Sequence, residues 1–216
     1  MTYRIAVLVS GSGSNLQSLL DAQSASELGA EVVLVVTDRA NAYGLQRALD
    51  HRVAALYLPL LTGRKKNGNA QVDARAVWEC RLADVITAFA PDLIILSGFM
   101  RVLSSSFLER FPNQIVNQHP ALLPEHGGDM VRTSSGLEIP VLRGAHVVAE
   151  ALQRGLPLTG CTVHRVTPVV DDGPVLARAE VPVLPDDDEA SLHERIKIEE
   201  RRLIVQVVRD LARADS

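Results

Sequence analysis

Three polar side chains of this sequence could together carry out an acyl transfer. Asn117 and His119 lie two residues apart in a strand-like segment, and Asp171 begins a turn further along the chain. An amide NH2 can hold the oxyanion of a tetrahedral intermediate, an imidazole can move protons, and a carboxylate can orient that imidazole and raise its pKa. Alternate residues of a strand project from the same face, so Asn117 and His119 could reach one substrate atom.

Each of these residues also has an ordinary structural interpretation. An isolated Asn-x-His pair is most often a satisfied polar pair, and the run Asp-Asp-Gly-Pro at 171–174 can simply be a turn, in which Asp172 competes with Asp171. We favour a catalytic role over the structural interpretation because residues at the carboxyl ends of central α/β strands line the ligand crevice. Pro120 and Pro124 would also stiffen the backbone after the strand.

A glycine loop precedes the first expected helix. The run Ser-Gly-Ser-Gly-Ser-Asn at 10–15 follows an apolar strand, and backbone N–H groups at such a helix start favour an anion, with phosphate the natural guest. The loop has neither the lysine of a Walker A loop nor the third glycine of the dinucleotide fingerprint. A tight turn capped by Asn15 remains the alternative.

Hydrophobic periodicity supplies the elements that must position these groups. Near-continuous apolar strands alternate with amphipathic helices in the first half of the chain, which predicts an α/β, Rossmann-like three-layer fold with a mostly parallel sheet and helices on both faces. The expected strands are 4–10, 32–36, 54–58 and 93–97, and the expected helices begin near Leu16, at Tyr43 and at Val72.

The second half has a different texture. After a strand at 115–118 comes a Gly, Ser and Thr-rich stretch, 125–140, that we interpret as a long loop or insertion before a helix over 141–153. Two further strands, 160–167 and 175–183, form an expected antiparallel pair across the Asp171 turn. An amphipathic helix over 189–214 closes the chain.

Composition narrows the class of protein. The chain of 216 residues is 47% hydrophobic with a net charge of −4 and a pI near 5.9, so we expect one soluble domain over 1–216 and no nucleic-acid partner. Its halves are about 1–110 and 111–216.

No apolar segment has bilayer length and no signal peptide is recognisable, so we expect no membrane association. Two cysteines without metal spacing indicate a reduced cytoplasm and no metal, and the loop at 62–69 is expected to be exposed and without function.

Several motifs taken together resemble the phosphoribosylglycinamide formyltransferases, a family of folate-dependent enzymes. The matching segments are 10–17, 98–103, 117–124 and 162–164 leading to 171–174, and the match extends over nearly the whole chain. The resemblance implies transfer of a formyl group from 10-formyltetrahydrofolate to the amine of 5'-phosphoribosylglycinamide in de novo purine biosynthesis. The amine would attack directly, without a covalent enzyme intermediate. Asp171 would keep His119 cationic.

The resemblance also implies binding residues. The substrate phosphate would lie on Gly13, Ser14 and Asn15. The rest of the phosphoribosylglycinamide would be bound by Lys197, Ile198, Glu199 and Glu200. Folate would contact Arg75, Met100, Arg101, Val102, Leu103, Asn117, Thr167, Pro168, Val169, Val170 and Asp171. The partners would be small molecules only, and the enzyme a monomer or homodimer. The sequence departs from the family pattern after Pro124, where the segment to Val141 is longer, and at Asp172, where glycine is frequent.

Three other functions stay open. A formyltetrahydrofolate hydrolase would use the same Asn, His and Asp with water as acceptor, but usually carries an added N-terminal domain. A methionyl-tRNA formyltransferase would need a C-terminal RNA-binding domain and more positive charge. A catalytically silent nucleotide-binding module would keep the glycine loop and need none of the three catalytic side chains.

Overall fold

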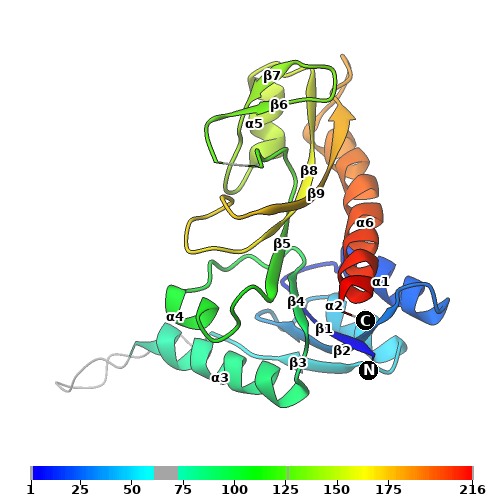
Figure 1. Cartoon of the computed structure of the whole chain (residues 1–216), viewed down its shortest axis with the longest axis vertical. Coiled ribbons are helices and arrows are strands. Elements are labelled where there is room, and N and C mark those ends of the chain that lie inside the picture. Colours follow the sequence, from blue (N-terminus) through cyan, green and yellow to red (C-terminus); the bar gives the residue numbers. More distant parts are fainter. Residues whose placement is uncertain (1, 61–72, 126, 216) are drawn as a thin grey trace.

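The computed structural model describes residues 2–60, 73–125 and 127–215. The predicted loop at 62–69 and the expected helix start at Val72 lie outside the described residues. Seven strands form one sheet in the order β3-β2-β1-β4-β5-β8-β9, which runs through both halves of the chain (Figure 1).

The first four strands are parallel, and three of them are almost fully buried, as their uninterrupted apolar sequences predict. The third along the chain lies at the sheet edge and is partly exposed. Alternate residues of β1 enter different cores: Ile5 and Val7 pack into one cluster, and Ala6 and Leu8 into the other. The sheet therefore has a hydrophobic layer on each side. These strands are β1 (Tyr3–Val9), β2 (Ala30–Thr37), β3 (Ala54–Tyr57) and β4 (Leu93–Leu96).

Helices cover both layers. The first cluster is closed by α1 (Ser14–Ser24), α2 (Gly44–Asp50), α5 (Val147–Gln153) and α6 (Glu189–Ala214). The second is closed by α3 (Ala74–Phe89) and α4 (Ser105–Leu108). The long helix α6 starts with a capping box in which Asp188 and Ser191 satisfy each other's backbone N–H, and its buried stripe includes Leu192 and Ile196. In Figure 1 it runs along the sheet from the upper part of the molecule down to α1.

The second half of the sheet changes direction. Strand β5 (Ile115–His119) is parallel to β4, whereas β8 (Leu158–Arg165) pairs antiparallel with β5, and β9 (Val175–Pro182) antiparallel with β8. This register sets Asn117 opposite His164 and His119 opposite Thr162. The predicted fold class, a mostly parallel sheet with an antiparallel carboxyl-terminal pair, is confirmed.

The segment 125–140 is not the irregular loop that we predicted. It contains a small antiparallel hairpin, β6 (Met130–Arg132) and β7 (Glu138–Pro140), turned at Gly136, whose φ is +85°. Val131 and Ile139 pack together against Leu122, and this separate apolar cluster holds the hairpin at one end of the molecule (Figure 1). The following helix accordingly begins at Val147 and not at 141.

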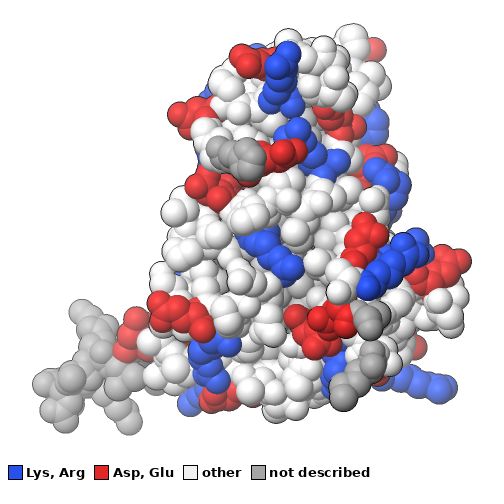
Figure 2. Space-filling view, in the orientation of Figure 1, with Lys and Arg blue, Asp and Glu red and all other residues white. Residues whose placement is uncertain are grey.

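Charges of both signs are interspersed on the face seen in Figure 2, and lysines and arginines form no continuous stripe there. None of the helices among the described residues is both long enough and apolar enough to cross a bilayer.

Candidate active site

A cavity of about 700 Å³ opens at the carboxyl ends of β1, β4 and β5. The glycine loop forms one part of its wall, the segment after β4 another, and the turn between β8 and β9 a third. The carboxyl ends of parallel strands are where α/β proteins bind ligands, because the strand order lets loops diverge there. All three predicted catalytic residues line this cavity: Asn117, His119 and Asp171.

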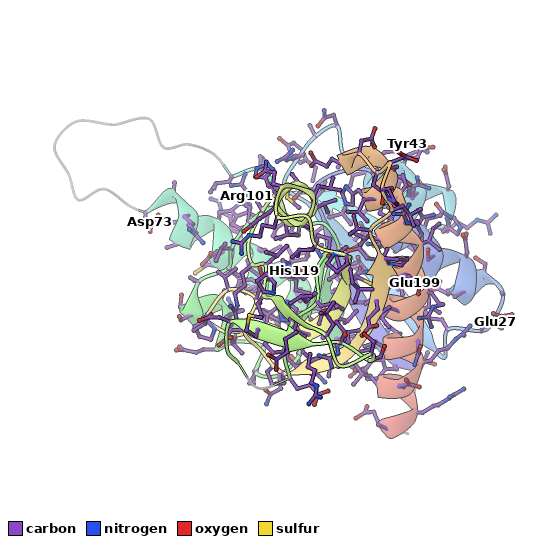
Figure 3. All side chains as sticks on the ribbon, turned by 90° about the horizontal axis from the view of Figure 1, so that it is seen from above. Glu27, Tyr43, Asp73, Arg101, His119 and Glu199 are labelled. Atoms are coloured by element: carbon purple, nitrogen blue, oxygen red, sulfur yellow. The ribbon has the colours of Figure 1, made fainter. Side chains whose placement is uncertain are left out.

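Asn117, His119 and Asp171 converge although 54 residues separate the first from the last. The His119 Nδ1 atom lies 3.4 Å from Asp171 Oδ2, and the Asn117 amide nitrogen lies 3.5 Å from Asp171 Oδ1. Figure 3 shows His119 near the centre of the molecule, among side chains from several elements. The predicted grouping of an amide, an imidazole and a carboxylate is thus present in space.

The charge of His119 differs from our expectation. Burial lowers the pKa of His119 below its ordinary value, although the Asp171 carboxylate and the Leu142 carbonyl both raise it. The prediction that Asp171 keeps His119 cationic is therefore wrong for the unliganded site, because desolvation of the imidazolium outweighs the attraction of the carboxylate. The Nε2 atom lies 2.7 Å from the Leu142 oxygen, so this nitrogen carries a proton that it donates to the carbonyl.

The turn holds Asp171 in an unusual conformation. Its φ is +51°, in the left-handed region that residues other than glycine seldom adopt, and the Gly144 N–H donates to its Oδ2 at 2.8 Å. Gly173 permits the turn, since a Cβ there would lie 1.8 Å from the Arg165 carbonyl oxygen. Burial acts to raise the pKa of Asp171, but the adjacent His164 and His119 side chains and the hydrogen bond from the Gly144 N–H together outweigh it, so the pKa is lowered. The carboxylate is therefore ionised and fixed in place before any ligand binds.

Asp172, the alternative carboxylate, points elsewhere. Its side chain is exposed and accepts a hydrogen bond from Arg143 at 3.2 Å. It does not line the cavity. Of the two neighbouring acids, Asp171 is the one that faces the imidazole.

His164 is a site residue that the sequence argument did not assign. It is buried, its Nε2 lies 3.3 Å from the Asn117 amide nitrogen and 3.6 Å from Asp171 Oδ1, and its Nδ1 lies 2.9 Å from the Arg165 oxygen. A carbonyl can only accept, so Nδ1 carries the proton and Nε2 accepts from Asn117. The available signal was the antiparallel register, which sets His164 opposite Asn117.

The glycine loop presents an uncapped helix start to the cavity. Gly13 is the N-cap of α1, with φ of +67°, and makes no side-chain cap hydrogen bond. A Cβ on Gly13 would lie 3.0 Å from the Gly44 Cα, so the loop packs closely on α2. Asn15 is not the cap of the alternative interpretation: its amide donates to Glu200 at 3.3 Å. The first backbone N–H groups of α1 thus remain available to an anion.

One face of α6 completes this end of the cavity. Lys197 and Glu200 line it together with Glu189 and His193, which we had not assigned. Burial raises the pKa of Glu200, and the Asn15 amide and nearby Lys197 only partly oppose this. Two predicted residues lie outside the lining: Ile198, which is 58% exposed, and Glu199, which pairs with Arg202.

Most of the predicted folate residues line the cavity, and two do not. Besides Asn117 and Asp171, seven of them line the cavity, and an eighth, Arg75, contacts a lining segment. Met100, Arg101, Val102, Leu103, Thr167, Val169 and Val170 line it, whereas Pro168 does not. Arg75 lies behind this wall and donates a hydrogen bond to the Val102 carbonyl. The segment 144–148, absent from our prediction, also lines the cavity and includes exposed His146.

Comparison with known proteins agrees with this geometry. The family model described as formyl transferase matches residues 3–208. The chain belongs to the formyl transferase family. A member from Mycobacterium tuberculosis, named phosphoribosylglycinamide formyltransferase, is 42% identical over 97% of this chain and 85% of its own length. The Escherichia coli formyl transferase of the same name is 32% identical over 94% and 84%.

A solved formyl transferase structure has the same fold. Glycinamide ribonucleotide transformylase 1 from Symbiobacterium toebii aligns with a TM-score of 0.83 at 37% identity, over 99% of this chain and 89% of that one. The resemblance that the motifs predicted is confirmed. Among the described residues, no group of three or more His, Cys, Asp or Glu side chains is arranged to hold a metal ion.

Proposed function

We propose that the chain transfers a formyl group from 10-formyltetrahydrofolate to the amine of 5'-phosphoribosylglycinamide, as a cytoplasmic enzyme of de novo purine biosynthesis. The observation that carries the proposal is the placing of Asn117, His119 and Asp171 in one cavity with an uncapped glycine loop. An acyl-transfer centre and an anion site in the same cavity suit a phosphorylated acceptor. The relatives named above support this choice.

The two substrates take opposite parts of the cavity in this proposal. The phosphate binds at Gly13, Ser14 and Asn15, and the glycinamide part extends toward Lys197 and Glu200. The folate lies between the segment 100–103 and the turn at 167–170. Met100 and Val102 are 65% and 60% exposed there, so they offer apolar surface for a flat ring system.

The amine nitrogen attacks the formyl carbon, and the carbonyl electrons move onto the oxygen. Asn117 stabilises this oxyanion. Its amide contacts to His164 and Asp171 are long, at 3.3 and 3.5 Å, so one N–H can turn to the substrate at little cost. A preorganised donor of this kind commonly contributes about 2.7 to 4 kcal/mol to the transition state.

His119 moves the proton that the reaction must transfer. In the neutral ring Nδ1 carries no proton, so it takes the proton from the attacking nitrogen and returns it to the departing folate nitrogen as the carbon–nitrogen bond breaks, giving the formamide and tetrahydrofolate. Asp171 stabilises the transient imidazolium. In the unliganded site the Asp171 carboxylate already acts to raise the pKa of His119, but burial has the larger, opposite effect. Acid–base assistance of this kind contributes about 10² to 10⁴ in rate.

Direct transfer agrees with the absence of an activated nucleophile among the described cavity residues. None of those residues is a cysteine. Cys161 is buried elsewhere, with its pKa raised to about 12 by burial, and Cys80 is exposed outside the cavity. The hydroxyl of Ser10 is engaged, since it donates to Asp38 at 2.7 Å. Among the described cavity residues, no serine or threonine hydroxyl is hydrogen-bonded to an imidazole that could activate it to form a covalent formyl-enzyme.

The test is to incubate the protein with 10-formyltetrahydrofolate, with and without 5'-phosphoribosylglycinamide, and to follow folate absorbance and the formylated product. We expect turnover only when both substrates are present. Equal folate consumption without the nucleotide would identify a hydrolase. No consumption in either mixture would reject the proposed function.

A further inference from the structure

Besides the two buried acids that line the cavity, a buried carboxylate lies behind its wall. Asp38 directly follows β2, and only 1% of its side chain is exposed. The Ser10 hydroxyl donates to its Oδ1 at 2.7 Å, and the Arg101 Nε donates to its Oδ2 at 2.6 Å. Asp38 does not line the cavity, so it is out of reach of the substrates. Its two hydrogen-bond donors belong to cavity segments more than ninety residues apart in the sequence.

Ser10 extends the link from Asp38 to the backbone. It is the first residue of the glycine loop; its hydroxyl accepts from the Met100 N–H at 2.9 Å, and its own N–H donates to the Gly98 carbonyl at 3.2 Å. The loop that would hold the phosphate and the segment that would hold the folate are therefore joined through Ser10 and Asp38. A shift of either loop must break or stretch one of these hydrogen bonds.

Arg101 has a defined orientation at the other side of this link. Its guanidinium lies 5.7 Å from the Trp78 ring centroid, and Trp78 stacks on Phe99 at 6.4 Å with an interplanar angle of 12°. Figure 3 labels Arg101 in the same central part of the molecule as His119. A paired and stacked arginine keeps one position more firmly than a solvated one, because both its charge and its flat face are satisfied.

Another buried acid provides a natural contrast. Glu79, on α3, accepts from the Ser104 N–H at 3.1 Å and from the Ser104 hydroxyl, and pairs with Arg75. It therefore fixes the far end of the same segment. None of the hydrogen bonds of Glu79 reaches the glycine loop.

We propose that Asp38 is a positioning residue that couples the two substrate sites. By bonding to Ser10 and Arg101 at once, it makes the glycine loop and the segment 98–103 adopt their binding conformations together. Phosphate on the glycine loop then favours folate binding, and folate favours phosphate binding by the same factor, because such coupling is reciprocal. The proposal rests on the function proposed above.

The test compares Asp38→Asn with Glu79→Gln. Tetrahydrofolate is titrated by calorimetry with and without saturating 5'-phosphoribosylglycinamide. In the unaltered protein we expect the nucleotide to tighten folate binding at least about 5-fold, the low end of usual coupling between sites. Asp38→Asn keeps an oxygen for Ser10 but loses the charge that pairs with Arg101, so the factor should fall close to one. Glu79→Gln should weaken folate binding and keep the factor.

Steady-state kinetics give a second measurement that a merely structural role would not produce. Asp38→Asn should raise KM for both substrates about 10-fold, because losing one charge-assisted hydrogen bond commonly weakens binding by about that factor. The kcat should be less affected. Glu79→Gln should raise KM for the folate alone. A wild-type coupling factor in Asp38→Asn, equal loss of coupling in both variants, or no coupling in the unaltered protein would overturn the proposal.

Two provisions keep the outcome interpretable. If Asp38→Asn does not fold, as judged by circular dichroism and thermal unfolding, Ser10→Ala removes the same link while leaving Asp38 paired with Arg101, and the same fall in coupling is expected. Failure of the proposed function is recognised separately, because it appears as absent turnover in the unaltered protein. The binding comparison can then be repeated with inorganic phosphate in place of the nucleotide.

Discussion

The two ends of the cavity hold buried acids in opposite states. Asp171, at one end, has two imidazoles and the Gly144 N–H around it, and its pKa is lowered. Glu200, at the other end, has a single side-chain donor, the Asn15 amide at 3.3 Å, and burial raises its pKa. A carboxyl group thus has several hydrogen-bonding partners at one end of the cavity and only one side-chain donor at the other.

The difference indicates separate tasks. A carboxylate whose partners are already in place needs no reorganisation during the reaction, which is what a charge-stabilising group requires. A carboxyl group that is buried with too few donors makes the folded state less stable and gains most when a ligand supplies a donor. We therefore assign Asp171 to the chemical step and Glu200 to recognition of the acceptor substrate.

The largest expected effect follows from replacing the satisfied acid. Asp171→Asn keeps the shape of the side chain but removes the charge that stabilises the imidazolium of His119, so kcat should fall by about 10² to 10⁴. KM for both substrates should change little. Steady-state assays that vary each substrate in turn measure both quantities.

The matched control is the neighbouring residue. Asp172→Asn alters the exposed acid that pairs with Arg143 and should leave kcat within about twofold, as for other exposed ion pairs. Equal losses in the two variants would mean that the turn as a whole, rather than the Asp171 carboxylate, supports catalysis.

Replacing the under-partnered acid should have a smaller and two-sided effect. Glu200→Gln keeps an oxygen for Asn15 and removes a buried charge, so the protein should become more stable at pH 8 by on the order of 1 kcal/mol. KM for 5'-phosphoribosylglycinamide should rise about 10-fold, as for loss of one charged hydrogen bond. Denaturant unfolding and steady-state kinetics measure the two effects.

The sign of the pH dependence provides the check on Glu200. A carboxyl group whose pKa is raised by folding supports the folded state at low pH, and that support is lost as pH rises through the folded-state pKa. The stability difference between Glu200→Gln and the unaltered chain should therefore grow from pH 4 to pH 8. A constant difference across that range would show that the Glu200 carboxyl group does not carry the effect.

A third expectation concerns His119. Its pKa is lowered by burial, so at acidic pH the unfolded chain binds a proton that the folded chain resists, and stability should fall as pH drops below about 6.5. His119→Gln should remove part of this loss, about 1.4 kcal/mol for each unit by which folding lowers the pKa. Urea unfolding of both proteins between pH 7.5 and 5 measures it. A steeper loss in the variant would contradict a neutral His119.

The sequence predicts best what depends on local pattern. The buried strands β1, β2 and β4 follow from uninterrupted apolar runs, and the shared face of Asn117 and His119 follows from strand alternation. Strands β6 and β7 were missed because each has three residues, too few for a periodic signal. His164 and the neutral state of His119 depend on strand register and on burial, which no single segment encodes.

The smallest expected effect separates residues that are neighbours only in sequence. A helix turns about 100° for each residue, so Lys197 and Glu200 share the cavity face of α6 while Ile198 and Glu199 lie on other faces. Ile198→Ala and Glu199→Gln should therefore change KM for either substrate by no more than about twofold, the usual range for exposed positions. Lys197→Met, which removes a charge beside Glu200, should raise KM for the phosphorylated substrate by several-fold. If Glu199→Gln raised this KM as much as Lys197→Met, Glu199 would contact the substrate, and the acceptor site would extend around α6 beyond the cavity described here.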